Sequence, residues 1–99
     1  QGDRVGPKIT IEPEVAKLDE PVTISVSISR GVEGRIEVKY YVNGSWKGNL
    51  ASYIDRREVS FTWVPPAPGI YTIKARNYPS GEFACKYIGG TSEAELIVQ

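Results

Sequence analysis

The stretch from Val59 to Ala75 constrains the fold of this chain more than any other part of its sequence. It reads V-S-F-T-W-V-P-P-A-P-G-I-Y-T-I-K-A, so two alternating apolar and polar runs flank a proline-rich centre. Strand side chains point to opposite faces with a period of two, so each run predicts a strand with one apolar face. Proline lacks a backbone donor and is excluded from central strands, so the centre predicts a corner between two strands.

The same alternation recurs along the rest of the chain. Val22, Ile24, Val26 and Ile28 alternate with serine and threonine, which indicates a strand with one buried and one solvated face. Further strands are predicted at Lys8 to Glu12, Arg35 to Val42, Ser45 to Gly48, Glu82 to Ile88 and Thr91 to Val98. Whether residues 82–98 form one kinked strand or two separate strands stays open.

The segments between these runs carry turn signals. Asn43-Gly44 predicts a tight hairpin, because both residues accept positive φ. Residues 49–56 are expected to bridge the short strand before them to the next, and residues 78–81 to form a turn. In the connection over residues 14–21, Val15 and Leu18 are expected to cover one end of the core.

The length and these strands predict one domain. We expect residues 1–7 to be a linker or loose terminus and residues 8–99 to form a single antiparallel β-sandwich of seven to eight strands. Apolar residues make up 40% of the chain and charged residues 24%, which are ordinary values for a folded domain.

The proline-rich corner also carries a family resemblance. The pattern W-x-P-P-x-P-G-x-Y-T-I-K-A, with Trp63, Pro68, Gly69 and Tyr71, resembles the E-to-F corner of immunoglobulin-like domains. It is most similar to CARDB-type and related bacterial and archaeal Ig-like modules of surface proteins. The resemblance implies a tyrosine corner at Tyr71, an Ig-like sandwich and an extracellular or cell-envelope location. Ile73 stands where antibody-type domains have a cysteine, so an inter-sheet disulfide is not expected.

Composition excludes several classes of function. Twelve basic and twelve acidic residues cancel, and Arg56-Arg57 is the only adjacent basic pair, which argues against nucleic-acid binding. No apolar run is long enough to span a bilayer. The absence of histidine removes the commonest general base and zinc ligand, so we expect neither an enzyme nor a metal centre nor a cofactor.

Two further groups of residues are candidate sites. Asp19, Glu20 and Asp55 are loop carboxylates without calcium-ligand spacing, so we interpret them as solvated charges. Cys85 is the only cysteine and is interpreted as a small buried apolar residue, with an intermolecular disulfide as the alternative.

Aromatic residues give the strongest binding signal. Tyr41, Trp46 and Tyr53 lie in or near the Asn43-Gly44 hairpin, where exposed rings stack on sugars or anchor protein partners. The alternative is that Trp46 covers an edge of the core. Asn43-Gly44-Ser45 also matches the N-glycosylation acceptor, although hairpin geometry already explains Asn-Gly.

The leading functional hypothesis is therefore a non-catalytic structural or interaction module used for adhesion, spacing or assembly. Its partner would be another protein or a second copy, paired along an edge strand, and Lys8 to Glu12 and Thr91 to Val98 are the candidate edges. Two alternatives are a carbohydrate-binding module that uses the exposed aromatic residues and an accessory domain of a secreted enzyme.

Overall fold

The computed structural model describes residues 3–28, 34–54, 56–79 and 87–99 of the chain, and every described element is a strand. The strands are β1 (Asp3–Val5), β2 (Pro7–Glu12), β3 (Val15–Ala16), β4 (Val22–Ile28), β5 (Gly34–Val42), β6 (Ser45–Ile54), β7 (Glu58–Trp63), β8 (Gly69–Pro79), β9 (Tyr87–Gly89) and β10 (Thr91–Val98).

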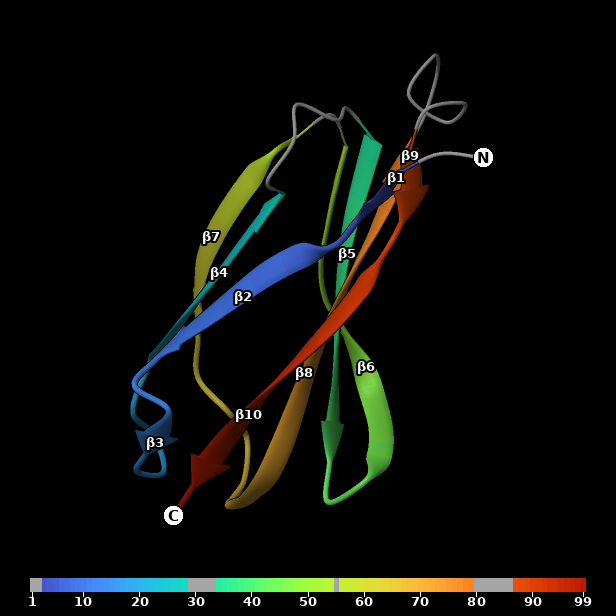
Figure 1. The fold of residues 1–99 in the computed structure, drawn as a ribbon. Helices are drawn as coiled ribbons and strands as arrows, with labels where there is room; N and C mark the ends of the chain where they lie inside the picture. Colours follow the sequence, from blue (N-terminus) through green and yellow to red (C-terminus); the bar gives the residue numbers. More distant parts are fainter. Residues whose placement is uncertain (1–2, 29–33, 55, 80–86) are drawn as a thin grey trace.

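Two sheets face each other to form a sandwich (Figure 1). The smaller sheet has the antiparallel order β2-β4-β7, and the larger has the order β3-β10-β8-β5-β6. β10 runs antiparallel to β8, and its last residues pair in parallel with β3. β1 pairs in parallel with β9 at the end of the sandwich where the chain begins. The predicted all-β, Ig-like antiparallel sandwich is confirmed.

The core lies between the apolar faces of the two sheets. The alternating residues of β4 are all buried, as are those at the centres of β5 and β8. The residues with no more than 1% exposure include Ala16, Val22, Ile24, Val26, Ile36, Val38, Tyr71, Ile73, Ala75 and Leu96. Burial of each large side chain of this kind contributes about 1.5–3 kcal/mol, so the period-two pattern fixes which face of each strand turns inward.

The proline-rich segment after β7 turns the chain from the small sheet into the large one. The Tyr71 hydroxyl donates a hydrogen bond to the Ala67 carbonyl oxygen and accepts one from the Ala67 backbone N–H at 3.1 Å. Gly69 has a φ of 151°, a conformation that essentially only glycine adopts. The ring of Tyr71 contacts Trp63 across the sandwich, with ring centroids 5.6 Å apart, and Tyr40 lies 5.0 Å from Trp63. This aromatic cluster joins the two sheets beside the corner.

The hairpin between β5 and β6 has the predicted turn. Asn43 and Gly44 have φ values of 51° and 87°, so both central residues lie on the positive side, as the twist of a tight hairpin demands. The returning strand is longer than predicted, because β6 continues to Ile54 and replaces most of the expected bridge over residues 49–56. Two register shifts against β5 interrupt the alternation of inward and outward side chains in β6, so the sequence shows no period-two pattern over its second half.

Other boundaries also differ from the sequence predictions. β8 continues through Tyr78 and Pro79, where a turn was expected, because both residues pair with the first residues of β5. Val15 and Leu18 are exposed by 51% and 43%, and Ala16 is the residue that closes this end of the core. A two-residue strand has no room for a periodic signal, so the sequence did not reveal which of its side chains turns inward.

The ends of the chain take part in the fold as well. The linker or loose terminus expected over residues 1–7 contains β1 and the first residue of β2. Gly90 separates β9 from β10, and these two strands pair with different partners. The remainder of the strand predicted over residues 82–88, Cys85 included, lies outside the described residues.

Candidate interaction surfaces

The outer face of the large sheet gathers charged and aromatic side chains from β5 and β8. The residues of these two strands that alternate with the buried ones all point to this side. We call this surface the charged face, and it carries Arg35, Glu37, Lys39, Tyr41, Lys74, Arg76 and Tyr78. Antiparallel register places Lys39 directly opposite Lys74, and Glu37 directly opposite Arg76.

The three aromatic residues singled out in the sequence do not form one strip. Tyr41 pairs with Trp46 across the hairpin, so these two side chains share the charged face, and Trp46 is 57% exposed. Tyr53 pairs with the buried Ile36 and packs against the core on the opposite side of the sheet. The residues that shift the register of β6 separate Trp46 from Tyr53, and because of this shift spacing alone does not assign the faces of these two side chains.

Cations lie over the tyrosine rings of the charged face. The Arg35 and Arg76 guanidinium carbons lie 4.4 and 4.7 Å from the centre of the Tyr78 ring. The Lys74 amine lies 5.0 Å from the centre of the Tyr41 ring. Cations at these distances are attracted by the ring quadrupole, with a strength of about 0.5–1 kcal/mol at exposed sites. The tyrosines therefore hold cations in place.

Carboxylates complete the arrangement. Glu37 accepts a hydrogen bond from the Tyr78 hydroxyl at 3.1 Å and lies 3.4 Å from the Lys39 amine. Glu93 of β10 lies 3.2 Å from the Lys74 amine. The hydrogen bond with Glu93, and then the nearby Tyr41, raise the pKa of Lys74 above its ordinary value. Lys74 therefore stays protonated throughout the neutral range.

The side chains of the charged face surround a shallow hollow of about 230 Å³. Its lining includes Glu37, Lys39, Tyr41, Lys74, Arg76 and Tyr78.

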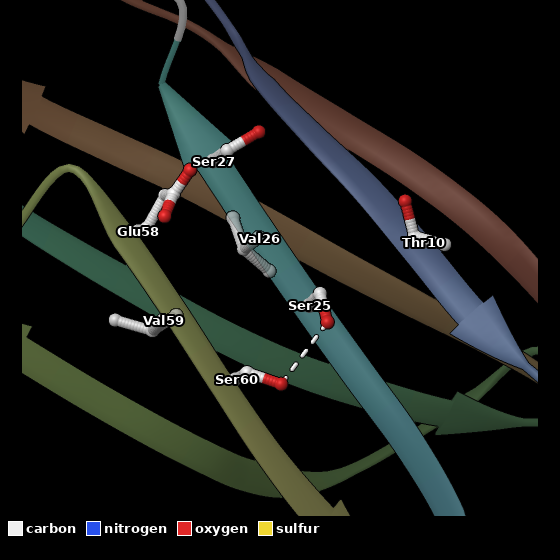
Figure 2. Close-up of a pocket in the computed structure, with 7 residues that line it drawn as sticks. All are labelled: Thr10, Ser25, Val26, Ser27, Glu58, Val59 and Ser60. Carbon is white, nitrogen blue, oxygen red and sulfur yellow. Dashed lines mark hydrogen bonds between the residues drawn. The ribbon is translucent and has the colours of Figure 1, made fainter.

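The outer face of the small sheet is different, because six of the nine side chains in its three rows are hydroxyls. Register places Thr10, Ser25 and Ser60 in one row, and the rows beside it are Lys8-Ser27-Glu58 and Glu12-Thr23-Thr62. Figure 2 shows the middle of this surface, where Ser25 and Ser60 are hydrogen bonded at 3.1 Å. Small hydroxyl side chains leave a shallow depression of about 420 Å³ above the sheet. The surface offers no group with distinctive chemistry.

The edges of the small sheet are unequal. The Arg57 carbonyl accepts a hydrogen bond from the N–H of Ile28, which lies opposite it. Hydrogen-bonded pairs alternate along an antiparallel ladder, so the backbone groups of Val59, Phe61 and Trp63 also bond to β4. The backbone groups of the alternate residues Glu58, Ser60 and Thr62 consequently point away from the sheet. The outward carbonyl of Pro7, on the edge strand β2, instead accepts a hydrogen bond from the hydroxyl of Ser92. Among the described residues, therefore, such a contact with the other sheet is made at the β2 edge and not at the β7 edge.

The predicted glycosylation residue Asn43 sits at the tip of the β5–β6 hairpin and is exposed. Its backbone N–H donates to the Ile70 carbonyl at 2.8 Å, and its side-chain oxygen accepts from the Ile70 N–H at 3.0 Å. These contacts fasten the hairpin to the start of β8. Glycosylation at Asn43 stays a prediction.

Two kinds of feature are absent from the described residues. No group of three or more histidine, cysteine, aspartate or glutamate side chains is placed to hold a metal ion in residues 3–28, 34–54, 56–79 and 87–99. The part of the chain that the structure describes also holds no helix long and apolar enough to cross a membrane.

Comparison with known proteins identifies the architecture. No protein-family model matches the sequence, and no curated protein matches it either. Among solved structures, the sulfur carrier protein SoxY from Chlorobium limicola superposes with a TM-score of 0.68 at 16% identity, over 94% of this chain and 78% of that one. The PKD domain of a peptidase from a Thermoplasmatales archaeon gives a TM-score of 0.57 at 16% identity, over 98% and 99%.

A CARDB domain from Pyrococcus furiosus gives a TM-score of 0.50 at 19% identity, over 97% of this chain and 96% of that one. Identities this low show a shared fold and say nothing further about activity. The resemblance seen at the proline-rich corner is confirmed at this level, and the chain has the fold of an Ig-like, CARDB-type module.

Proposed function

We propose that this chain is a non-catalytic structural and interaction module of an extracellular or cell-envelope protein, and that it pairs with a second copy along the free edge of β7. The fold shared with CARDB and PKD domains supports the first part of this proposal. The chain also has no histidine from which a common acid, base or nucleophile arrangement could be built.

The unprotected edge of β7 carries the second part. Natural proteins protect edge strands with proline, lysine, bulges or a covering segment. β2 begins at Pro7 and contains Lys8, and β6 contains Lys47 and two register shifts. β7 contains no proline, lysine or register shift, and Glu58 is the only charge among its six residues, E-V-S-F-T-W. Of the two candidate edges predicted from sequence, β2 is a protected edge and β10 lies between β8 and β3.

A second copy is the partner that fits this edge best. If two β7 strands run antiparallel about a two-fold axis at Ser60, each Glu58 carboxylate meets a Thr62 hydroxyl and not another carboxylate. The outward backbone groups of Glu58, Ser60 and Thr62 then pair with each other. Val59 comes opposite Phe61, which is only half-buried in one copy, so the contact extends the apolar side of the sheet. Each backbone bond contributes about 1 kcal/mol net, which predicts weak, concentration-dependent dimers.

The test is the solution mass of the chain from micromolar to millimolar concentration, measured by size exclusion with light scattering. Ser60→Pro removes an N–H that points to solvent in one copy, so the variant is expected to fold and stay monomeric. Ser60→Thr keeps that N–H and is the matched control, which should dimerise like the unchanged chain. Thr62→Lys places a charge at the same edge without altering the backbone and should also remain monomeric.

A strictly monomeric unchanged chain at millimolar concentration would overturn the pairing. So would Ser60→Pro and Thr62→Lys variants that dimerise as well as Ser60→Thr. Circular dichroism of each variant establishes that it is folded before its mass is interpreted.

A further inference from the structure

The charged face carries four cations, Arg35, Lys39, Lys74 and Arg76, and three carboxylates, Glu37 of β5 with Glu93 and Glu95 of β10. Lys39 and Lys74 stand directly opposite each other on neighbouring strands, and like charges in this arrangement destabilise a sheet. Arg35 and Arg76 extend the cationic row along the same two strands. The ion pairs with Glu37 and Glu93 lower the repulsion between the two lysines, but these carboxylates are partly exposed and each pair contributes little.

The two arginines are arranged to bind an anion. Both guanidinium groups rest on the ring of Tyr78, at 4.4 and 4.7 Å from its centre. Among the described residues, no carboxylate lies within 4 Å of either guanidinium. A guanidinium that stacks on a ring keeps its N–H groups at the edge of its plane, where they match the two oxygens of a carboxylate or sulfate. Because Tyr78 already orders both side chains, binding loses less conformational freedom.

The aromatic residues indicate which kind of anion fits. Cations already lie over the Tyr41 and Tyr78 rings, so a neutral sugar would have to compete with them for these ring faces. Trp46 is 57% exposed and lies beside Tyr41, at the end of the face opposite Arg35 and Tyr78. Tyr41 and Arg35 are six residues apart on β5, which is roughly 20 Å at ~3.4 Å per residue. One sugar ring on Trp46 and several acidic groups along the cations would occupy that length.

We propose that the charged face binds an acidic polysaccharide, with a sugar ring stacked on Trp46 and its carboxylate or sulfate groups bound by Lys39, Lys74, Arg76 and Arg35. The ligand lies across β5 and β8 in the open hollow of about 230 Å³. This surface is on the opposite sheet from the β7 edge, so the inference stands independently of the proposed pairing.

The test is affinity electrophoresis of the intact chain in gels that contain one polymer each. Polygalacturonate supplies carboxylates, dextran sulfate supplies sulfates, and unmodified dextran is the neutral control. We expect retardation in at least one acidic gel and none in dextran, and the acidic polymer that retards more identifies the anion. Retardation should weaken as salt is added, because exposed charges are screened over about 8–10 Å near physiological ionic strength.

Variants place the site. Arg76→Gln and the pair Lys39→Gln with Lys74→Gln should each weaken binding at least ten-fold. Lys8→Gln removes one positive charge from the outer face of the small sheet and is the matched control, expected to bind unchanged. Trp46→Ala should weaken binding to the acidic polysaccharide while leaving any binding to poly-L-glutamate unaltered, because only the sugar ring uses the indole.

Several results would overturn the proposal. The first is that neither acidic gel retards the chain. The second is that Lys8→Gln and Arg76→Gln lose equal binding affinity. The third is that poly-L-glutamate binds as tightly as the acidic polysaccharide and that neither binding depends on Trp46. Ser60→Pro should bind the polysaccharide normally and Arg76→Gln should dimerise normally, so failure of one proposal is distinguishable from failure of the other.

Discussion

Replacing Tyr71 by phenylalanine tests whether the corner between β7 and β8 is held by one hydroxyl. Tyr71 is fully buried, and its hydroxyl both donates to and accepts from the backbone of Ala67. The substitution keeps the ring, so the contact with Trp63 at 5.6 Å remains and only the two hydrogen bonds are lost. The experiment therefore separates the hydroxyl from the aromatic packing.

The size of the effect follows from the surroundings of these bonds. Each hydrogen bond contributes about 0.5–1.5 kcal/mol net. Ala67 is exposed, so water can satisfy its freed N–H and carbonyl, which limits the total loss to about 1–2 kcal/mol. For a domain of this size, 1 kcal/mol lowers Tm by about 4–8 °C, so we expect a decrease of roughly 4–16 °C.

The measurement is equilibrium unfolding by urea, with the midpoint and slope fitted together, and thermal unfolding as a second probe. Tyr40→Phe is the matched control, because Tyr40 belongs to the same aromatic cluster and its hydroxyl has no hydrogen-bond partner among the described residues. If Tyr71→Phe lowers the unfolding free energy no more than Tyr40→Phe does, the hydroxyl does not hold the corner and this reasoning is refuted.

Three further substitutions test other parts of the structure. Gly69→Ala should lower the unfolding free energy by about 1–3 kcal/mol, because φ is 151° and the new Cβ would lie 3.2 Å from Val42. At Gly44 a new Cβ would have no atom within 4 Å, so Gly44→Ala should lower the unfolding free energy less. Equal losses of unfolding free energy in urea titrations of the two variants would contradict this. Asn77→Val should raise stability by about 1 kcal/mol in the same titration, because the buried Nδ2 of Asn77 lacks a hydrogen-bond partner among the described residues; a loss would show that the amide is satisfied. The pKa of Lys74 is raised by Glu93 and then Tyr41. The stability contributed by the Lys74 charge is therefore present below the ordinary lysine pKa and is lost as the pH rises through the raised pKa, so the stability difference between the unchanged chain and Lys74→Met should shrink over that alkaline range. A stability difference that stays constant with pH would refute the interaction.

Local chemistry alone was enough to predict several elements. Strict alternation in β4 gave its span and buried face, because a one-residue slip would expose every apolar side chain to water. Asn43-Gly44 gave the hairpin, and the proline run gave the corner, because these residues restrict or permit backbone angles without help from the rest of the chain. The Ig-like sandwich then followed from the number and spacing of the alternating runs.

Tertiary structure decided what depends on pairing between distant segments. Two register shifts in β6 place Tyr53 against the core while Trp46 stays outside, and no local periodicity reports a shift that exists only relative to β5. The same holds for the charged face, where Arg35 and Arg76 are far apart in sequence and meet on Tyr78 only through the register of β5 with β8. Which edge is free is likewise a property of the assembled sheet, since β7 and β2 carry similar alternating patterns and only β2 is closed by Ser92. Sequence therefore determined the strictly alternating strands and their buried faces, because burial and turn chemistry act within a few residues. Only the fold determined which side chains and backbone groups come together on the surface, because register joins residues that the chain keeps apart.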